Sequence, residues 1–538
     1  MFALAPWRHR SFTLAIVAYG ICIFAAAAGM PGMAQAATPR PARAAWRRRI
    51  QAILREPQNR HAFWGIEVYS LTRRRVLYRH NAARMFIPAS NTKLFTVSAA
   101  LCLLGPDYRY HTTVRAIAPP RPEGAHSLPA VSGGQVLGNL VLIGRGDPTL
   151  SGRIYPYPNP ALHLRRQPGD QALIKLAAQV AAHGIRQVDG NIIGDDSYFR
   201  YQPYPNDWAQ DDLMWGYGAP ISALTINDNQ MQVKIRPGRR AGLPARIAIH
   251  PWLGSYRIVN RLLTVPRGGR EKIHLDRPVG SRRLEFWGTM PLGARPDKET
   301  ISVVDPALHA ARLFRRALLR QGVRVLGHAQ ARHCLAFPAR LGNALRPCTP
   351  PRPGARLARL TSPPLWQDLQ WTLKVSQNLH AELFLRLLGR RFGGDGSLRA
   401  GEKARAHFLD AQAGLRPSEY NFHDGSGLSR ATLIQPRAIV KLLRYMARRP
   451  APLADMFRSF LPLAGVDGSL EHRFLHTPAQ GRLSAKTGYL EHDRALSGYV
   501  TSRSGDRLVF SIIVNADTSH GAQMRHAIDQ IALAMMRE

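Results

Sequence analysis

Residues 88–104 read PASNTKLFTVSAALCLL, and this stretch decides how the rest of the chain is interpreted. A helix start signal ends at Ser90, and the residues that follow are mostly apolar up to Leu104. A helix that is apolar on nearly all faces is buried, so the stretch predicts a helix through a core over residues 91–104. Positions i and i+3 share one helical face, so we expect the hydroxyl of Ser90 and the amine of Lys93 to touch.

The amine of Lys93 is unusual for this chain. Of the 74 lysine and arginine residues, only nine are lysines, so surface charge is supplied almost entirely by arginine. A lysine on an apolar helix therefore indicates chemistry that a guanidinium cannot perform, such as losing its proton. Burial lowers the basicity of lysine and makes it a base for a serine hydroxyl near neutral pH. In the alternative interpretation, Ser90 only caps the helix and Lys93 is a solvated charge.

Two more short motifs follow along the chain. Ser376-Gln377-Asn378 is weak by itself, because serine and asparagine commonly cap helices. Lys486-Thr487-Gly488 is more specific, because lysines are rare here. A strand would present Lys486 and Thr487 to the anionic end of a substrate, and Gly488 would let the substrate backbone approach. The alternative for Lys486-Thr487-Gly488 is an ordinary turn after a strand.

In this order the three motifs resemble the signature of the penicillin-binding proteins and serine β-lactamases. Further segments narrow the resemblance to the class C, type-4 penicillin-binding proteins, a family of D-alanyl-D-alanine carboxypeptidases and endopeptidases. These segments are Gly144-Arg145-Gly146-Asp147-Pro148, Ile221 to Asn229, Asp424 to Arg430, and Gly465-Val466-Asp467-Gly468. The resemblance extends over nearly the whole chain after its first segment.

The resemblance implies an acyl-enzyme mechanism with a role for each residue of the first two motifs. Ser90 would be the acylated nucleophile, and Lys93 its general base. Ser376 would relay a proton toward the leaving amine, and Asn378 would hold both the substrate amide and the Lys93 amine. The substrates implied are peptidoglycan stem peptides, and β-lactam antibiotics would acylate the same serine.

The resemblance also assigns the third motif. Lys486 would add positive potential that keeps Lys93 neutral, and Thr487 would bind the terminal carboxylate of the substrate. The backbone N–H groups of Ser90 and Tyr489 would form the oxyanion hole beside Gly488. The family usually has Ser-Leu after Lys-Thr-Gly, whereas this chain has Tyr489-Leu490. A bulky ring beside the acyl site leaves the backbone role intact and puts the rate and the β-lactam affinity in question.

The implied fold class is α/β (α+β): a β-lactamase/DD-peptidase-like domain, in which helices cover an antiparallel sheet, with a mixed β-rich insertion. Strand patterns occur near 61–78 and in three successive segments after residue 483, which are closed by a final helix over 521–536. Such strands suit one antiparallel sheet covered on a face. We expect the catalytic domain in residues 37–106 and 354–538, with an inserted α/β region, possibly of two subdomains, over 107–353.

The first segment and the net charge indicate where the protein acts. Residues 1–36 join a basic start, an apolar run and Ala34-Gln35-Ala36, which is typical of a cleaved signal peptide and predicts a periplasmic enzyme. An uncleaved anchor is the alternative. The net charge of +39 favours anionic wall or membrane surfaces, and export argues against nucleic acid. Of the remaining cysteines, Cys334 and Cys348 could close a short loop, and Cys102 is expected to be a buried free thiol.

Two other functions fit part of the sequence. A β-lactamase would share the chemistry, but class A enzymes need a carboxylate to activate the deacylating water, and no Glu-x-x-x-Asn lies between the second and third motifs. A non-catalytic wall-binding protein would use the cationic surface alone, which the three intact motifs argue against. No metal-binding or phosphate-loop pattern is present in the sequence, so no cofactor is expected.

Overall fold

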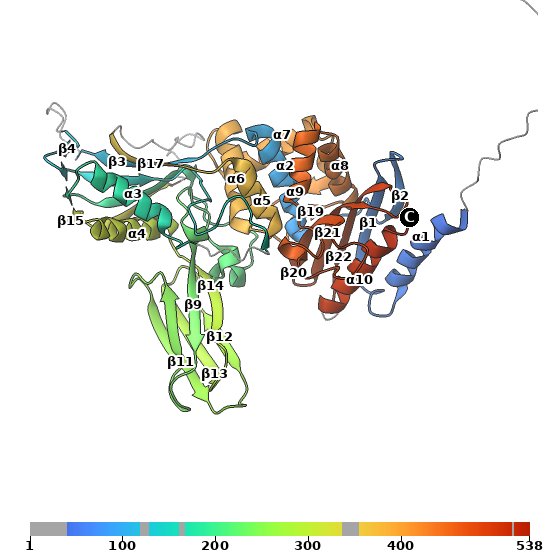
Figure 1. Cartoon of the computed structure of the whole chain (residues 1–538), viewed down its shortest axis with the longest axis horizontal. Coiled ribbons are helices and arrows are strands. Elements are labelled where there is room, and N and C mark those ends of the chain that lie inside the picture. Colours follow the sequence, from blue (N-terminus) through green and yellow to red (C-terminus); the bar gives the residue numbers. More distant parts are fainter. Residues whose placement is uncertain (1–39, 119–128, 161–166, 336–353, 519–520) are drawn as a thin grey trace, which may run out of the picture.

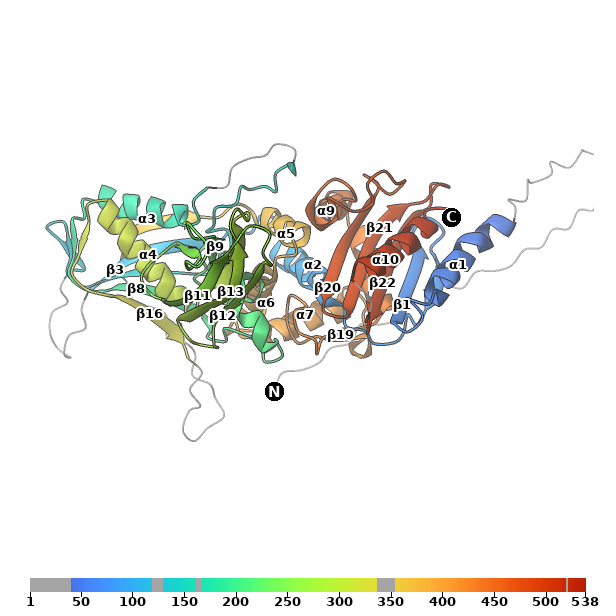
Figure 2. The same cartoon turned by 90° about the horizontal axis from the view of Figure 1, so that it is seen from below.

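The computed structural model describes residues 40–118, 129–160, 167–335, 354–518 and 521–538 (Figure 1). The expected signal peptide over 1–36 and Cys348 lie outside these ranges. The molecule is elongated: a helix-covered sheet lies at one end, a mixed sheet at the other, and a lobe of strands projects from the side (Figures 1 and 2). No helix in the described ranges combines the length and hydropathy needed to cross a bilayer.

The sheet at the end where the chain terminates has five antiparallel strands in the order β2-β1-β22-β21-β20. It joins a hairpin near the start of the chain to the three last strands, all of which the sequence predicted. The strands are β1 (Phe63–Ser70), β2 (Arg75–His80), β20 (Leu483–Leu490), β21 (Asp493–Thr501) and β22 (Arg507–Asn515). β20 forms one edge of this sheet.

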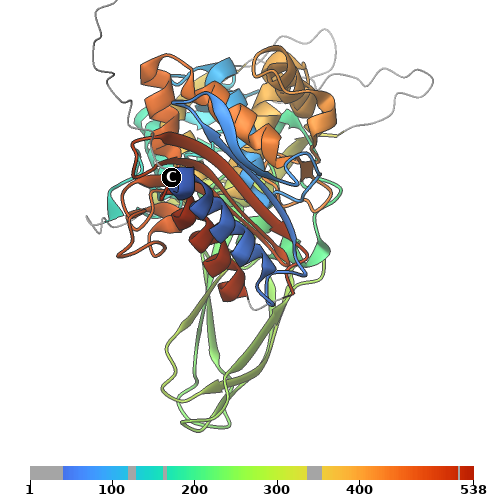
Figure 3. The ribbon, with the colours of Figure 1, turned by 90° about the vertical axis from the view of Figure 1, so that its right-hand side faces the viewer.

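Helices cover this sheet on both faces (Figure 3), whereas we expected cover on one. On one face lie α1 (Arg40–Arg55) and α10 (Gly521–Met535), and on the other lie α2 (Thr92–Leu104) and α8 (Pro436–Ala447). Helix α1 escaped prediction because it is rich in arginine. Its Trp46, Ile50 and Ile53 nevertheless recur at helical spacing and are buried.

Helix α2 runs through the centre of a helical layer, as its apolar sequence predicted. Every residue from Thr92 to Leu101 is buried. The helices that pack against α2 include α5 (Leu365–Lys374), α6 (Asn378–Phe392), α7 (Leu398–Ala411) and α8. Helix α9 (Ala451–Phe460) packs on α5 and α8, and the short strands β18 (Tyr420–Asn421) and β19 (Leu433–Ile434) form a hairpin nearby.

The expected insertion contains a mixed five-stranded sheet in the order β16-β8-β6-β3-β17. Its strands are β3 (His111–Ile117), β6 (Asn139–Ile143), β8 (Ile192–Arg200), β16 (Ala329–Cys334) and β17 (Ala355–Thr361). Helices α3 (Gln171–Ala182) and α4 (Pro306–Arg320) pack together beside it. A small sheet adds β4 (Val131–Ser132), β5 (Gln135–Val136), β7 (Gln187–Val188) and β15 (Arg324–Val325). The domain limits stay a prediction, and because β17 pairs with β3, we propose that the insertion extends to Thr361.

The projecting lobe consists of two three-stranded sheets with a core of their own around Met231, Leu262 and Phe286. One sheet has β9 (Gln230–Arg236), β10 (Arg246–His250) and β14 (Asp297–Ser302), and the other has β11 (Arg257–Val265), β12 (Lys272–Asp276) and β13 (Arg283–Pro291). Of the cysteines, Cys334 is disulfide-bonded, and Cys102 is free and half-buried.

Candidate active site

Ser90 and Lys93 meet as their spacing predicted. Ser90 lies in a single 3-10 turn, Ala89–Asn91, which leads directly into α2, and its side chain is half-buried. The amine of Lys93 lies 2.8 Å from the Ser90 hydroxyl oxygen. The first turn of a core helix therefore places a nucleophile beside a base.

The surroundings of the Lys93 amine favour its neutral form. The side chain is fully buried, and besides Ser90 the amine donates to the Asn378 side-chain oxygen at 2.6 Å and to the Ser426 carbonyl at 2.7 Å. Burial lowers the pKa of Lys93 to about 7, against the opposite effect of two nearby carboxylates. Because the two carbonyl oxygens can only accept, a neutral amine directs its lone pair toward the Ser90 hydroxyl.

The second motif begins with a strained residue. Ser376 has a φ of +61°, in the left-handed region that favours glycine, and its hydroxyl accepts a hydrogen bond from the Lys486 amine at 2.9 Å. Asn378 is the first residue of α6, and its amide donates to the backbone carbonyl of Tyr217 at 3.0 Å. The motif therefore joins the first and third motifs, and Tyr217 of the insertion also reaches the site.

The third motif lies on the edge strand β20. Lys486 is fully buried, and its amine also donates to the Thr487 carbonyl at 2.7 Å. Burial, with a further contribution from Lys93, lowers the pKa of Lys486 well below its usual value. A charge on Lys93 thus disfavours a charge on Lys486. Complete burial does not favour a permanently charged Lys486 in the free enzyme, and the expectation that Lys486 keeps Lys93 neutral stays a prediction.

Two glycines allow the three motifs to approach one another. A side chain at Gly488 would come within 2.7 Å of the Pro88 carbonyl, so the strand packs closely on the turn that carries Ser90. At Gly427 the φ of +78° is in the left-handed region, and a Cβ would come within 1.9 Å of the Ala89 carbonyl. We assigned Gly488 to the approach of substrate, and the structure adds this internal packing.

The loop that carries Gly427 is a part of the site that we did not assign from the sequence. The Ser426 carbonyl binds Lys93, and the backbone N–H groups of Gly425 and Ser426 both donate to one oxygen of Glu382 at 2.8 Å. Asp424 accepts from the backbone N–H groups of Gly427 and Ser429. The segment Asp424 to Arg430, quoted for the family resemblance, could have indicated this loop. Glu382 could not be singled out, because it lies within the regular helical pattern of α6.

Thr487 is oriented by the last of the quoted segments. Its hydroxyl lies 2.7 Å from the hydroxyl of Ser469, which directly follows Gly468. In the same segment, Asp467 accepts a hydrogen bond from the Lys374 amine at 2.6 Å. This ion pair connects α5, which ends just before the second motif, to the loop that supports the third.

A buried ion network lies behind the second motif. His380 on α6 is fully buried between Asp368, at 2.8 Å, and Asp228 of the insertion, at 3.0 Å. Asp228 also pairs with Arg153 and accepts from the Gln377 side chain at 3.0 Å. The two aspartates overcome the effect of burial and raise the pKa of His380 to about 9. The insertion thus contacts the central residue of the second motif.

The ring of Tyr489 is 67% exposed. The guanidinium carbon of Arg494 lies 4.2 Å from the ring centroid, and Arg494 is itself buried and donates to the Leu490 carbonyl at 2.6 Å. Stacking on this cation gives the ring a partner on β21. Tyr217, which is also exposed, donates its hydroxyl to Asp212 at 2.9 Å.

The site residues expected from the sequence therefore come together around two amines, Lys93 and Lys486. Among the described residues there is no cluster of three or more histidine, cysteine or acidic side chains that could hold a metal ion. A hydroxyl, a buried amine with a lowered pKa and a second hydroxyl–amine pair can together perform acyl transfer to a serine.

Comparisons with known proteins agree with this chemistry. The model of the D-Ala-D-Ala carboxypeptidase 3 (S13) family matches residues 46–535. The D-alanyl-D-alanine carboxypeptidase of Actinomadura sp. (strain R39) is 33% identical over 477 residues, which cover 87% of this chain and 80% of that protein.

Solved structures confirm the fold class. The crystal structure of penicillin binding protein 4 (dacB) from Haemophilus influenzae matches with a TM-score of 0.73 at 21% identity, over 90% of this chain and 98% of that chain. A structure of the same protein complexed with a novel β-lactam matches with a TM-score of 0.69, at the same identity and coverage.

Proposed function

Because the chain belongs to the D-Ala-D-Ala carboxypeptidase 3 (S13) family, it is a serine-type D-alanyl-D-alanine carboxypeptidase that acts on peptidoglycan, and we propose that Ser90 is its acylated nucleophile. The single observation that carries this assignment is the buried amine of Lys93, 2.8 Å from the Ser90 hydroxyl oxygen. The rest of the site supports a role for each motif residue.

In the acylation step, the neutral amine of Lys93 takes the proton of the Ser90 hydroxyl as its oxygen attacks the carbonyl of the penultimate D-alanine. Asn378 and the Ser426 carbonyl hold that amine at 2.6 and 2.7 Å and fix the direction of its lone pair. The backbone N–H groups of Ser90 and Tyr489 donate to the developing oxyanion.

The leaving D-alanine needs a proton, which Ser376 delivers to its amine. The Ser376 hydroxyl accepts a hydrogen bond from the Lys486 amine at 2.9 Å, so the two groups can relay a proton. Thr487 binds the terminal carboxylate of the substrate beside Lys486, and Gly488 keeps the strand open to the substrate backbone. The arriving carboxylate favours the charged form of Lys486, and that charge in turn disfavours a proton on Lys93.

Labelling with a fluorescent penicillin tests these assignments. The wild type is expected to form a stable adduct at Ser90, located by mass analysis of the labelled peptide, and to release D-alanine from a pentapeptide substrate. Ser90→Ala is expected to lose both activities. Lys93→Arg keeps the charge but cannot act as a base, so it is expected to label far more slowly. Equal labelling of Ser90→Ala and the wild type would overturn the assignment.

A further question is which peptide bonds of peptidoglycan the enzyme cleaves. We propose that the enzyme also cleaves stem-peptide cross-links, as the endopeptidases that the sequence resembles do. Digestion of purified muropeptides, with products resolved by mass, separates the loss of one alanine from the splitting of dimers. A chromogenic cephalosporin tests the β-lactamase alternative, for which slow turnover is expected because no Glu-x-x-x-Asn of the class A type lies between the second and third motifs.

The site of action is the cell wall, and we propose that the enzyme is periplasmic, exported by a signal peptide that is removed after Ala36. The net charge of +39 supports an electrostatic contact with anionic wall or membrane surfaces. N-terminal sequencing of the protein from a periplasmic extract tests the cleavage site. A mature protein that begins at Met1 would contradict it.

A further inference from the structure

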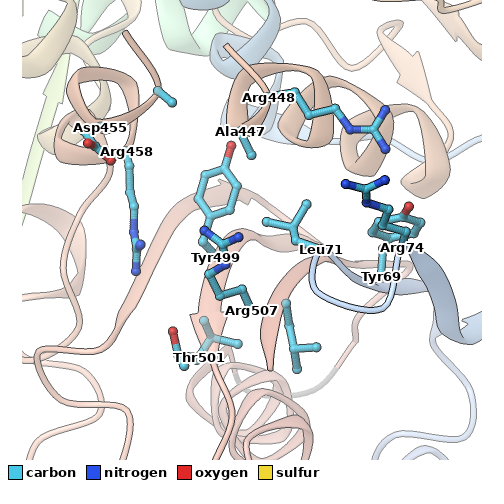
Figure 4. Close-up of a pocket in the computed structure, with 13 residues that line it drawn as sticks. Tyr69, Leu71, Arg74, Ala447, Arg448, Asp455, Arg458, Tyr499, Thr501 and Arg507 are labelled. Atoms are coloured by element: carbon cyan, nitrogen blue, oxygen red, sulfur yellow. The ribbon is translucent and has the colours of Figure 1, made fainter. Parts of the chain in front are cut away.

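A cavity of about 520 Å³ lies between the five-stranded sheet and helices α8 and α9 (Figure 4). Its lining comes from the ends of β1, β21 and β22, from the turn after β1 and from the two helices. None of the site residues named above lines it. The volume is within the range of sites that bind small molecules, so the cavity is large enough for a ligand of its own.

Four arginines line this cavity: Arg74, Arg448, Arg458 and Arg507. The lining contains one carboxylate, Asp455. In the part of the chain that the structure describes, none of the four guanidinium groups is within salt-bridge distance of a carboxylate. The lining thus has an excess of positive charge, which a multiply charged anion would neutralise.

Arg73 and Arg74 are neighbours in the turn after β1, but their guanidinium groups differ in their partners. Arg73 pairs with Asp506 at 3.2 Å and with Glu538. Arg74 follows it with a φ of +53°, in the left-handed region that favours glycine. Arg73 thus has carboxylate partners, whereas the guanidinium of Arg74 faces the cavity with none within salt-bridge distance in the described part of the chain.

The four arginines are exposed, and hydrogen bonds hold two parts of the wall between them. The buried ring of Tyr499 donates its hydroxyl to the Leu443 carbonyl at 2.8 Å, and Figure 4 shows Arg458 on one side of this ring and Arg74 on the other. The backbone N–H of Arg507 donates to the Thr72 hydroxyl at 3.1 Å, which ties β22 to the turn. A site whose backbone is already held loses little freedom when a ligand binds.

We propose that this cavity binds a phosphate group. A guanidinium is a planar fork that matches phosphate oxygens with two hydrogen bonds, and several such forks together suit a group with many acceptor oxygens. One fork would suffice for a single carboxylate. The group belongs either to a free phosphate compound or to the headgroup of an anionic lipid, and the chemistry of recognition is the same for both.

Inorganic pyrophosphate is the probe for the first source. Calorimetric titration of the whole protein at physiological salt is expected to show saturable binding. The variant Arg458→Gln/Arg507→Gln is expected to bind at least about tenfold more weakly, because two forks are lost. The control variant Arg239→Gln/Arg240→Gln removes the same charge from an exposed part of the lobe and is expected to bind as the wild type does.

Vesicles distinguish the second source. If the group is a lipid headgroup, the wild type sediments with phosphatidylglycerol vesicles but not with phosphatidylcholine vesicles, and the cavity variant loses this sedimentation while the control keeps it. If the group is a free phosphate, pyrophosphate binds and the cavity variant and the control sediment equally. Absence of binding in both assays, or equal binding of pyrophosphate and vesicles by the cavity variant and the control, would overturn the proposal.

Penicillin labelling checks that the cavity variant is folded, since the cavity contains no site residue, and labelling at the wild-type rate is expected. Arg74→Gly provides an independent variant, because glycine suits the backbone conformation at this position and the charge is removed without strain. It too is expected to weaken pyrophosphate binding, and full affinity in this variant together with full affinity in the double variant would count against the site.

Discussion

At the scale of single residues, the proposed mechanism depends on the protonation of one amine. Lys93 is fully buried and is held by Ser90, Asn378 and Ser426. Its pKa is lowered to about 7 by burial, although Asp424 and Glu382 act in the opposite direction. The base is therefore about half neutral at neutral pH in the free enzyme.

This pKa predicts the pH dependence of acylation. Only the neutral amine accepts the proton of Ser90, so the rate of penicillin labelling is expected to fall about tenfold per pH unit below about pH 7 and to level off above it. Labelling time courses at a series of pH values measure this. A rate that is independent of pH across that range would mean that Lys93 is not the base.

Gly427 provides a prediction about packing beside the nucleophile. A Cβ at this position would meet the Ala89 carbonyl at 1.9 Å, and φ is +78°. Gly427→Ala is expected to lower the free energy of unfolding by about 2 kcal/mol or more and to slow acylation, because the turn of Ser90 must shift. The control Gly394→Ala has a φ of +93° with no heavy atom within 4 Å. Urea denaturation and penicillin labelling of both variants are compared. Gly394→Ala reports backbone strain alone, and Gly427→Ala adds the clash with the Ala89 carbonyl. Equal effects of the two substitutions would contradict the packing argument.

At the scale of elements, helix α6 connects the insertion to the catalytic motifs. Its first residue is Asn378, and His380 one position beyond Leu379 is enclosed by Asp228 and Asp368. The Gln377 side chain donates a hydrogen bond to Asp228, which holds Gln377 in place between Ser376 and Asn378. The insertion therefore supports the second motif from behind, in addition to forming its own sheets.

This network predicts how stability changes with pH. A histidine whose pKa is raised in the folded state stabilises the fold fully below its ordinary pKa, about 6.5, and loses that contribution as the pH rises through about 9. The free energy of unfolding is expected to fall over this interval in the wild type. His380→Gln should be less stable at neutral pH and lack this part of the fall. His423→Gln removes a histidine that pairs with Asp207 near the surface and serves as the control, which should keep the wild-type slope.

At the scale of the whole molecule, charge and catalysis are separable. The chain carries a net charge of +39, whereas the groups proposed to react lie together between a helix and an edge strand. Exposed charges interact over a distance of about 10 Å at 0.1 M salt and about 3 Å at 1 M. Contact with an anionic wall should therefore depend on salt, and acylation by a small β-lactam should depend on it much less.

Sedimentation with purified sacculi checks this separation. Binding is expected to weaken strongly between about 0.1 M and about 1 M salt, to the same extent in the wild type and in Ser90→Ala, because charge and not the acyl-enzyme supplies the contact. Penicillin labelling of the wild type in the same buffers is expected to change little. Retention on sacculi that does not respond to salt would show that specific contacts dominate.

Much of the architecture could be predicted from local sequence. The apolar run after Ser90 predicted a core helix, since no face of it was suited to water, and the alternating strands at both ends of the chain predicted an antiparallel sheet. Helix α1 was missed, and with it the second covered face, because its arginines obscured the stripe of Trp46, Ile50 and Ile53. A periodic pattern that is narrow and interrupted by charge is hard to recognise until its partner surface is known.

The sequence by itself was enough to propose which residues carry the chemistry, because Ser90 and Lys93 are one helical turn apart and their contact follows from local geometry. Only the tertiary structure decided the rest of the site. Glu382, Ser426 and Asp228 are distant in sequence from the groups they support, and burial, which sets the pKa of Lys93, comes from elements packed around α2. Contacts across the chain depend on how all the elements pack, and no local pattern contains that information.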